Sequence, residues 1–379
     1  MIDFDVNSSG TAKIKVVGVG GGGNNAVDRM IEENITAIDF ITVNTDYQAL
    51  MNSLAPTKLQ LGSKLTRGLG AGGVPEIGKK SAEETMDEIT NIVSGADMVF
   101  VTAGMGGGTG TGAAPVIASI ARSLGILTVG VVTKPFDFEG RRRMKNATEG
   151  IAELRRSVDT LVVIPNQKLF DVIPKDTSVI ESFKKADEVL RQGVLAIAEL
   201  ISKPGVVNLD FADIRSIMQD KGIAHMGVGR ASGKNKTVEA TQLAIKSPLL
   251  DTSIKGAKSV LLSIAGDRNL KLDDLGAAGN IVQDDVDSEA NIIFGTSINE
   301  ELEDEVIVTV IATEIDDDDV ARIAIPLVNG EPAPQPESGA NAAASAHKVK
   351  EAPAFKPVSD SLNDDTPIDI PIFLQNRKK

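Results

Sequence analysis

The segment that most limits the choice of fold reads Gly104-Met105-Gly106-Gly107-Gly108-Thr109-Gly110-Thr111-Gly112. The apolar residues 97–102 before it are typical of a buried strand, and residues 113–124 after it have the pattern of a helix. Glycine amides at the start of a helix surround the oxygens of an anion, and threonine hydroxyls add further donors. A flexible Gly/Thr linker would not lie between a strand and a helix. The segment therefore predicts a loop that binds phosphate groups.

A second glycine-rich loop lies near the N-terminus. Residues 16–25 read V-V-G-V-G-G-G-G-N-N and contain the pattern G-x-G-x-x-G from Gly18 to Gly23. The pattern lies between an expected strand and an expected helix, which is where phosphates bind. It leaves the ligand open, because a Rossmann dehydrogenase has the same fingerprint and Asp39 or Asp46 lies near the position of a ribose-binding acid. A tight strand–helix turn without a ligand is the other alternative.

The two loops together narrow the choice between these nucleotide-binding proteins. A dehydrogenase needs the first loop alone, whereas two such loops imply a longer chain of phosphates held from both sides. The sequence also lacks G-x-x-x-x-G-K-[ST], so the chain is not a P-loop NTPase.

Strand and helix patterns alternate along the first half of the chain, which predicts a parallel sheet covered by helices on both faces. The expected strands are residues 13–19, 38–43, 97–102, 126–133 and 160–164. The expected helices are residues 25–33, a helix from Pro75, and residues 113–124 and 141–156. The expected fold class is therefore α/β, with a Rossmann-like nucleotide-binding domain over residues 13–180.

The longest helical pattern lies within residues 181–204, and Gly205 after Pro204 stops it. A helix of this length would span about 33 Å, enough to connect two domains. We expect a loop and a following helix at residues 205–222 and a second α/β domain at residues 223–316. The expected strands of that domain are residues 259–264, 291–295 and 306–312.

The ends of the chain differ in composition from the rest. Residues 1–12 are polar, which predicts a flexible N-terminus. Residues 317–365 begin in an acidic run and become rich in Pro, Ala, Ser and Glu, so they cannot bury enough apolar surface to fold. Residues 366–379, T-P-I-D-I-P-I-F-L-Q-N-R-K-K, combine apolar anchors with a basic end. This favours a peptide that docks on a partner, and a fraying tail is the alternative.

Composition excludes several classes of protein. The net charge of −14 disfavours broad nucleic-acid binding, because an acidic surface repels phosphate backbones. The chain has no Cys, which excludes disulfides and thiolate metal sites, and its two His leave little room for a zinc site. The N-terminus lacks the pattern of a signal peptide, and no apolar run is long enough to span a membrane. We therefore expect a soluble cytoplasmic protein.

The loops and the motifs around them resemble the tubulin/FtsZ family, and within it the FtsZ proteins of bacterial cell division. Residues 106–112, G-G-G-T-G-T-G, match the signature of that family. The resemblance runs from about residue 13 to residue 315, and the C-terminal peptide adds to it. The other motifs appear in order: residues 20–25, Asn44-Thr45-Asp46, Gly70-Ala71-Gly72-Gly73, Thr133-Lys134-Pro135-Phe136-Asp137-Phe138-Glu139-Gly140, Ile164-Pro165-Asn166 and Asn208-Leu209-Asp210-Phe211-Ala212-Asp213.

The resemblance implies a site for GTP or GDP. Glu139 would accept a hydrogen bond from the ribose, and Arg143 would lie near the sugar and phosphates. Phe183 would stack on the base, and Asn166 and Asp187 would read guanine, whose N1–H and N2–H both donate. The phosphates would be held by Gly21, Gly22, Gly23, Asn24, Asn25, Gly108, Thr109 and Gly110, with the γ-phosphate at Ala71, Gly72 and Gly73. The same site would include Gly20, Asn44, Asp46, Gly104, Gly107 and Thr133.

Some of these residues have an ordinary structural explanation as well. Arg143 ends an Arg-Arg-Arg run, which is often a solvated helix start, and Phe183 has the character of a core residue. Two positions depart from the family pattern. The first loop ends in Gly23-Asn24-Asn25, whereas in the family a single Asn after Gly is more usual. The extra polar side chain, Asn24, would lie near the phosphates and modestly alter nucleotide exchange. Residues 184–188 carry more charge than expected around Asp187.

Asp210 and Asp213 are the candidates for orienting the water that attacks GTP. Their spacing also fits a helix N-cap with a capping box, and the residues alone favour that explanation. The resemblance favours catalysis, because in the family this loop completes the nucleotide site of the neighbouring subunit. A site shared between unlike faces is a heterologous contact, and such contacts give open filaments when they do not close.

The expected function is thus a GTPase activated by polymerisation that forms head-to-tail filaments of the bacterial division ring at mid-cell. Mg²⁺ would neutralise phosphate charge, with no metal site built from protein ligands alone. Residues 366–379 would bind the ring's membrane anchors and regulators, so that contact with the membrane is indirect. Two alternatives are an NAD-dependent Rossmann oxidoreductase and a non-hydrolysing tubulin-like scaffold. The first leaves residues 104–112 unexplained and has no catalytic His or Tyr–Lys arrangement that we identify.

Overall fold

A computed structural model describes residues 12–32, 35, 38–174, 177–202, 207, 210–247, 250 and 252–315. All of them belong to one unit of the chain, Met1–Val328. The expected flexible N-terminus, apart from residue 12, lies outside the described residues, as do the expected linker and the C-terminal peptide.

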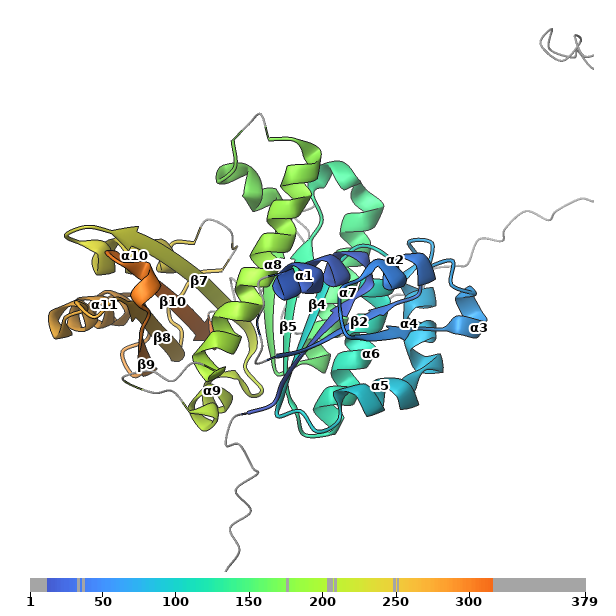
Figure 1. The fold of residues 1–379 in the computed structure, drawn as a ribbon, viewed down its shortest axis with the longest axis horizontal. Coiled ribbons are helices and arrows are strands. Elements are labelled where there is room, and N and C mark those ends of the chain that lie inside the picture. Colours follow the sequence, from blue (N-terminus) through green and yellow to red (C-terminus); the bar gives the residue numbers. More distant parts are fainter. Residues whose placement is uncertain are drawn as a thin grey trace, which may run out of the picture. The chain divides into compact units, whose positions relative to one another are not determined.

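The described strands form one sheet in the order β3-β2-β1-β4-β5-β6-β7-β10-β8-β9 (Figure 1). The strands are β1 (Ile14–Val19), β2 (Ile38–Asn44), β3 (Thr57–Gln60), β4 (Met98–Gly104), β5 (Leu127–Lys134), β6 (Thr160–Pro165), β7 (Gly222–Ser232), β8 (Ser259–Gly266), β9 (Asn291–Ile298) and β10 (Glu305–Thr313). Strands β1 to β6 pair in parallel, so their carboxyl ends meet at one edge of the sheet.

These strands form because their side chains are apolar on both sides. The first four residues of β4, Met98-Val99-Phe100-Val101, are all fully buried. Successive side chains of a strand point to opposite faces, and a parallel sheet buries both. In β1, Val16 accordingly packs in a core cluster with Leu190, whereas Val17 packs in a second cluster with Ile117.

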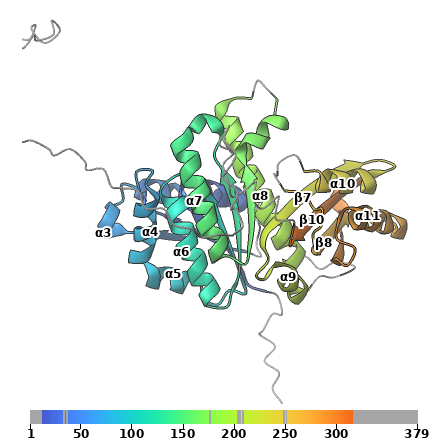
Figure 2. The same ribbon diagram turned by 180° about the vertical axis from the view of Figure 1, so that it is seen from behind.

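Helices cover both faces of the parallel part (Figures 1 and 2). The helices are α1 (Gly20–Glu32), α2 (Tyr47–Asn52), α3 (Ser63–Thr66), α4 (Pro75–Glu84), α5 (Met86–Val93), α6 (Thr109–Ser123), α7 (Arg141–Ser157), α8 (Val179–Ser202), α9 (Phe211–Met218), α10 (Lys236–Ile245) and α11 (Leu272–Asp285). The short 3₁₀ helices are η1 (Asp137–Glu139), η2 (Asn166–Asp171) and η3 (Glu300–Leu302). Helices α1, α8 and α9 share one core cluster, and α5, α6 and α7 share the other.

The long central helix, α8, is confirmed, and β7 joins the two halves of the sheet. β7 pairs in parallel with β6 over two residues and then in antiparallel fashion with β10 over nine. Helix α10 lies very close to β7, since a Cβ built on Gly227 or Gly229 would lie within 2 Å of a carbonyl oxygen of α10. The second half is therefore a mixed sheet, with β8 and β9 parallel.

The structure differs from the sequence expectations at two kinds of place. Helix α1 begins at Gly20 and α6 at Thr109, inside the glycine loops rather than after them. The glycines thus supply the first turns of both helices. The expected strands also omitted the short, partly exposed β3 and the long β7. The Gly and His residues of β7 break the apolar run that marked the other strands.

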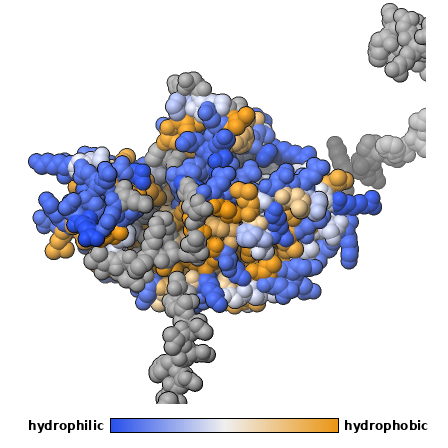
Figure 3. Space-filling model, viewed as in Figure 1, coloured by the Kyte–Doolittle hydropathy of each residue, from blue (hydrophilic) through white to orange (hydrophobic). Residues whose placement is uncertain are grey.

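The surface is unevenly apolar. On the face shown in Figure 3, hydrophobic residues gather over the half that contains β1–β6, whereas the half that contains β8–β10 is mainly hydrophilic. Within the described residues, no helix has the length and apolar character that crossing a membrane requires.

Candidate functional site

The two glycine loops meet at one edge of the sheet. β1 and β4 are hydrogen-bonded neighbours, with Val19 opposite Ala103. β1 leads directly into α1, and β4 leads into α6 through residues 105–108. The N-termini of α1 and α6 therefore lie next to each other and point their free N–H groups toward the same space. Two helix N-termini make this edge a favourable place for a chain of negative charges.

The glycines fall into two groups by what surrounds them. A Cβ on Gly20 would lie 2.9 Å from the nitrogen of Gly110, and one on Gly23 would lie 2.3 Å from the oxygen of Thr102. These glycines let the loops approach each other. By contrast, Gly21 and Gly107 have no atom within 4 Å of a built Cβ. Their backbone thus borders open space, as a loop that cradles a ligand requires.

A third loop, residues 70–73, packs against the second glycine loop, residues 104–112. The Cβ of Ala71 lies 2.7 Å from the place of a Cβ on Gly108, so the two loops are in direct contact. Gly72 and Gly73 have φ values of 58° and 72° and open space around them. The left-handed backbone there favours glycine, and the open side leaves their amides accessible. Asn146 of α7 donates to the carbonyl of Gly73 at 3.5 Å.

Asn24, Asn44 and Asp46 face the protein rather than open space. In the orientation that satisfies its amide, the Asn24 nitrogen donates to the carbonyls of Gly18, Gly20 and Val43, and its oxygen accepts from Asn44. Asn24 is buried. Asp46 caps α2 by accepting from the nitrogen of Ala49 at 3.0 Å. These side chains hold the loops in shape.

Two threonines of the site are likewise engaged. The hydroxyls of Thr45 and Thr109 are 2.6 Å apart, which links the end of β2 to the start of α6. Thr133 is buried near Gly104, and its carbonyl accepts from the nitrogen of Met105 at 2.9 Å. Both contacts fix the second glycine loop between β2 and β5.

Glu139 and Arg143 form an ion pair at the start of α7. Nε of Arg143 lies 3.0 Å from Oε2 of Glu139, whose side chain is 8% exposed. The other oxygen of Glu139 accepts from the nitrogen of Phe136 at 2.9 Å. Arg143 is half exposed, but its ion pair with Glu139 distinguishes it from a fully solvated residue at a helix start. The pair holds the Glu139 carboxylate in place beside the loops.

Phe183 belongs to a cluster of four phenylalanines. Its ring packs edge-on against Phe136, 5.5 Å between centroids, and against Phe138 at 6.5 Å. Phe136 is fully buried, whereas Phe183 is 38% exposed and Phe138 62%. Aromatic rings backed by a buried ring and open on one side offer a stacking surface. Phe138 lies in the motif at residues 133–140, but the sequence alone gives it no role.

Asp187 lies on α8, one turn after Phe183, and contacts Arg29 of α1. Oδ2 of Asp187 is 3.6 Å from Nε of Arg29. Burial raises the pKa of Asp187 to about 6, and the Arg29 guanidinium opposes this. Sequence reasoning missed Arg29, although its spacing of four residues from the exposed Asn25 places both on one face of α1.

Asn166 supplies an unpaired polar atom. It is 5% exposed, at the end of β6, and Oδ1 has no hydrogen-bond partner among the described residues. A buried acceptor without a donor is costly, so a ligand donor in this place would stabilise it. The open glycine amides, the aromatic surface, the buried carboxylate and this orphan acceptor together fit a nucleotide with a donor-bearing base.

Asp210 and Asp213 are not part of this constellation. Helix α9, which they begin, contacts residues at the starts of β5 and β6: Arg215 donates to Gly125 O at 3.0 Å, and Thr160 bonds the carbonyl of Met218. These contacts lie at the amino edge of the parallel strands, opposite the glycine loops. Strands of 6–8 residues put about 20 Å between the two edges.

The two aspartates form the capping box that the sequence allowed. The Asp213 nitrogen donates to Oδ1 of Asp210 at 2.8 Å, and the Asp210 nitrogen donates to Oδ2 of Asp213 at 3.2 Å. Asp210 is exposed and Asp213 is half-buried. Each carboxylate uses one oxygen in the cap, which leaves the other free for water or a ligand.

Family models match both halves of the chain. Residues 13–174 match the model described as "Tubulin/FtsZ family, GTPase domain", and residues 222–316 match "FtsZ family, C-terminal domain". An empty FtsZ dimer of M. jannaschii is 45% identical, with a TM-score of 0.77, over 81% of this chain and 89% of that one. A mutant of the same protein is also 45% identical, with a TM-score of 0.77, over 81% of this chain and 92% of that one.

More distant structures share the fold. A protofilament of CetZ2 from Haloferax volcanii, bound to GTPγS, is 21% identical with a TM-score of 0.70, over 82% of this chain and 97% of that one. At this identity the likeness speaks for the fold alone. The fold expected from the sequence, with a parallel-sheet domain, a long central helix and a second domain, is confirmed.

Proposed function

Because the chain belongs to the tubulin/FtsZ family, a family of guanine-nucleotide-binding GTPases, we propose that it hydrolyses GTP and assembles head to tail into filaments of a bacterial division ring. The observation that carries this proposal is the separation of the phosphate loops from Asp210 and Asp213, which lie at opposite edges of the sheet. One copy cannot bring its own carboxylates to its own nucleotide, whereas the next copy can.

The nucleotide binds at the carboxyl edge of the parallel strands. The phosphates lie on the amides of the two glycine loops, with residues 71–73 around the γ-phosphate and Arg143 beside the sugar. The base lies against Phe183, where Asn166 and Asp187 meet its polar edge. A carboxylate suits guanine, because N1–H and N2–H both donate, and adenine offers no such pair of donors.

Mg²⁺ accompanies the triphosphate in this proposal. Among the described residues, no group of three or more His, Cys, Asp or Glu is arranged to hold a metal ion. Mg²⁺ prefers to keep several waters and to bind phosphate oxygens, so in this proposal the nucleotide and water hold it. Bound there, the ion neutralises charge that develops on the phosphates.

Asp210 and Asp213 act on the nucleotide of the adjoining copy. The capping box holds each carboxylate by one oxygen, and the second oxygen polarises the attacking water. The contact joins unlike faces, so repeated assembly gives an open filament. Assembly thereby creates the hydrolytic site, and hydrolysis removes the γ-phosphate from the contact. The FtsZ dimer of M. jannaschii, 45% identical to this chain, supports self-association.

The filament works in the cytoplasm at mid-cell, and residues 366–379 recruit membrane anchors and regulators of the ring. The support is the composition of that peptide, apolar anchors followed by Arg377-Lys378-Lys379, at the end of a polar segment. Deletion of residues 366–379 is expected to preserve GTP turnover and abolish recruitment to anchor-bearing membranes. A deleted chain that is still recruited contradicts this part.

Sedimentation with GTP, GDP or ATP, with phosphate release followed in parallel, tests the function. We expect polymer with GTP alone and phosphate release in proportion to polymer. Polymer without phosphate release indicates a non-hydrolysing scaffold. Binding of NADH in preference to GTP indicates the oxidoreductase, which no feature of the second glycine loop favours.

A further inference from the structure

Helix α9 is held at its C-terminal end by side chains from both halves of the sheet. Thr160, at the start of β6, donates its hydroxyl to the carbonyl of Met218. Thr313, at the end of β10, donates to the carbonyl of Ile217 at 2.9 Å. Both threonines are fully buried. The last carbonyls of a helix lack partners within the helix, so these two contacts determine where α9 ends.

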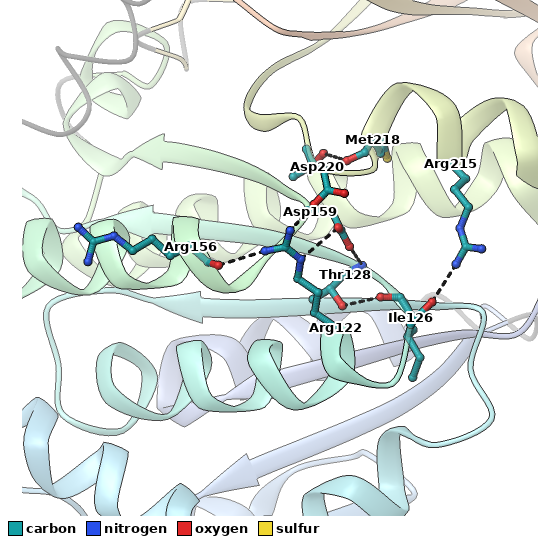
Figure 4. Close-up of polar contacts among 10 residues, drawn as sticks. Arg122, Ile126, Thr128, Arg156, Asp159, Arg215, Met218 and Asp220 are labelled. Carbon is teal, nitrogen blue, oxygen red and sulfur yellow. Dashed lines mark hydrogen bonds and ion pairs between the residues drawn. The ribbon is translucent and has the colours of Figure 1, made fainter.

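Arg122 secures the chain immediately after this helix (Figure 4). It lies in the last turn of α6 and reaches three partners. Nη2 bonds the carboxylate of Asp220, Nε lies 3.4 Å from Oδ1 of Asp159, and Nη1 donates to the carbonyl of Arg156 at 3.1 Å. Asp159 is buried, and its second oxygen accepts from the nitrogen of Thr128 at 2.8 Å. One guanidinium thus joins α6, α7 and the turn after α9.

The turn between α9 and β7 has an unusual backbone conformation and is bonded to Asp159. Asp220 has φ 57°, a left-handed conformation that is uncommon for any residue except Gly, Asn and Asp. The nitrogens of Lys221 and Gly222 both donate to the carbonyl of Asp159, at 2.9 and 2.8 Å. The backbone carbonyl of Asp159 therefore holds the turn by two hydrogen bonds. The side chains of Asp159 and Asp220 both pair with Arg122.

The two ends of α6 connect this turn to the nucleotide edge. Thr109 starts α6 within the second glycine loop, and Arg122 lies one residue before the helix ends at Ser123. A helix of 15 residues is about 22 Å long. Arg215 of α9 also donates to the carbonyl of Gly125, just beyond α6, at 3.0 Å. One helix thus spans the distance between the phosphate loop and the support of α9.

We propose that Arg122, with Asp159 and Asp220, is a positioning residue for hydrolysis: it fixes α9, and with it Asp210 and Asp213, relative to the helix that carries the phosphate loop. This inference rests on the proposed function, because it matters only if those aspartates serve the next copy. A carboxylate that polarises water must hold its place closely, and a displacement of about 1 Å far from the chemistry lowers turnover by up to about a hundredfold.

Asp220 allows this role to be separated from simple stability. Its side chain is 60% exposed, and exposed ion pairs contribute little to folding. Asp220→Asn keeps the shape of the side chain and tolerates a positive φ, but it removes the charge that meets Arg122. Asp220→Gly keeps the backbone conformation and removes the side chain altogether. Neither substitution touches the buried Asp159.

Phosphate release per unit of sedimented polymer is the measurement, together with GTP affinity and hydrogen exchange at amides 211–218. We expect Asp220→Asn and Asp220→Gly to lower turnover per polymer roughly tenfold, with GTP affinity within about twofold of the wild type. Exchange at the amides of α9 should accelerate. Asp304→Asn is the matched control, because it removes an exposed acid paired with Lys236 at 3.0 Å in the other half of the sheet. Its turnover should equal that of the wild type.

Failure of the inference is distinguishable from failure of the proposed function. If the wild type itself releases phosphate at the same rate with and without polymer, the proposed function fails. If the wild type depends on polymer but both Asp220 variants turn over normally, Arg122 has no positioning role. A loss of GTP affinity equal to the loss of turnover also overturns the inference, because the effect would then be a general loss of structure.

Discussion

Oδ2 of Asp187 lies 3.6 Å from Nε of Arg29, which makes an ion pair between the central helix α8 and the last turn of α1. Asp187 lies one helical turn after Phe183 on α8. Burial nevertheless raises the pKa of Asp187 to about 6, so desolvation outweighs the attraction of the guanidinium. The carboxylate is thus kept in a costly charged state at neutral pH, and a ligand that donates hydrogen bonds to it relieves that cost.

Guanine nucleotide binding should therefore weaken at acid pH. In the proposed site the charged carboxylate accepts from guanine, so binding would lower the pKa of Asp187 from its value of about 6 in the free protein. The affinity for GDP should be level above that value and fall by up to about tenfold per pH unit below it. Calorimetric titration between pH 5 and 8 measures this. Asp187→Asn serves as the control, because it retains the titration of the phosphates and loses that of the carboxylate. Parallel pH profiles for the two proteins would contradict the prediction.

The nucleotide-free fold should be more stable with Asp187→Asn at neutral pH. A carboxyl group whose pKa is raised in the folded state favours folding only while it is protonated, and this contribution is lost as the pH rises through about 6. The neutral amide avoids that loss. The gain should be about 3 kcal/mol at pH 7 and about half of that at pH 5. Urea unfolding of nucleotide-free protein at both pH values checks it, and a variant less stable than the wild type at pH 7 disproves it.

Phe183→Ala should weaken GDP binding about tenfold, because stacking of a base on an aromatic ring contributes about 1–3 kcal/mol. Phe170→Ala is the matched control: Phe170 packs edge-on against the same Phe136 at 5.5 Å and is also exposed. Equilibrium binding of a fluorescent guanine nucleotide distinguishes the two. Equal losses in both variants would show that Phe183 acts only through the phenylalanine cluster.

Asp213→Ala should bind GTP and polymerise but release phosphate at least about a hundredfold more slowly, since the water loses its base. Asp213→Asn keeps an acceptor for the capping contact with Asp210, so it separates the helix cap from the chemistry. Both variants should lose turnover alike, as measured by phosphate release per sedimented polymer. Restoration of turnover by Asn would show that the cap, and not the carboxylate charge, is what hydrolysis needs.

Local patterns predicted the parts of the fold whose cause is local. The glycine loops, the strands β1, β4 and β5 and the helix α8 each follow from periodicity or from glycine spacing. The sequence did not predict β7, because Gly227 and Gly229 allow the close approach of α10. This tertiary requirement weakens the pattern by which a strand is recognised. The orientation of the Asn24 side chain is likewise set by tertiary contacts, since its amide nitrogen donates to three backbone carbonyls.

The sequence predicted only those candidate site residues that belong to a recognisable motif. Arg29 meets Asp187 and Phe138 meets Phe183 only because different elements pack together, and spacing along one element does not predict such contacts. Arg122, Asp159 and Asp220 lie far apart in the sequence, and none belongs to a repeated pattern. Their convergence is a property of how the ends of α6, β6 and α9 pack, so no reading of one segment could find it.

The rate of GTP hydrolysis per subunit, measured as a function of protein concentration, tests the central claim most directly. If carboxylates of one copy complete the nucleotide site of the next, the rate per subunit should fall to a low basal value below the concentration at which polymer forms and rise steeply above it. A rate per subunit that stays constant through that concentration would contradict a hydrolytic site shared between copies.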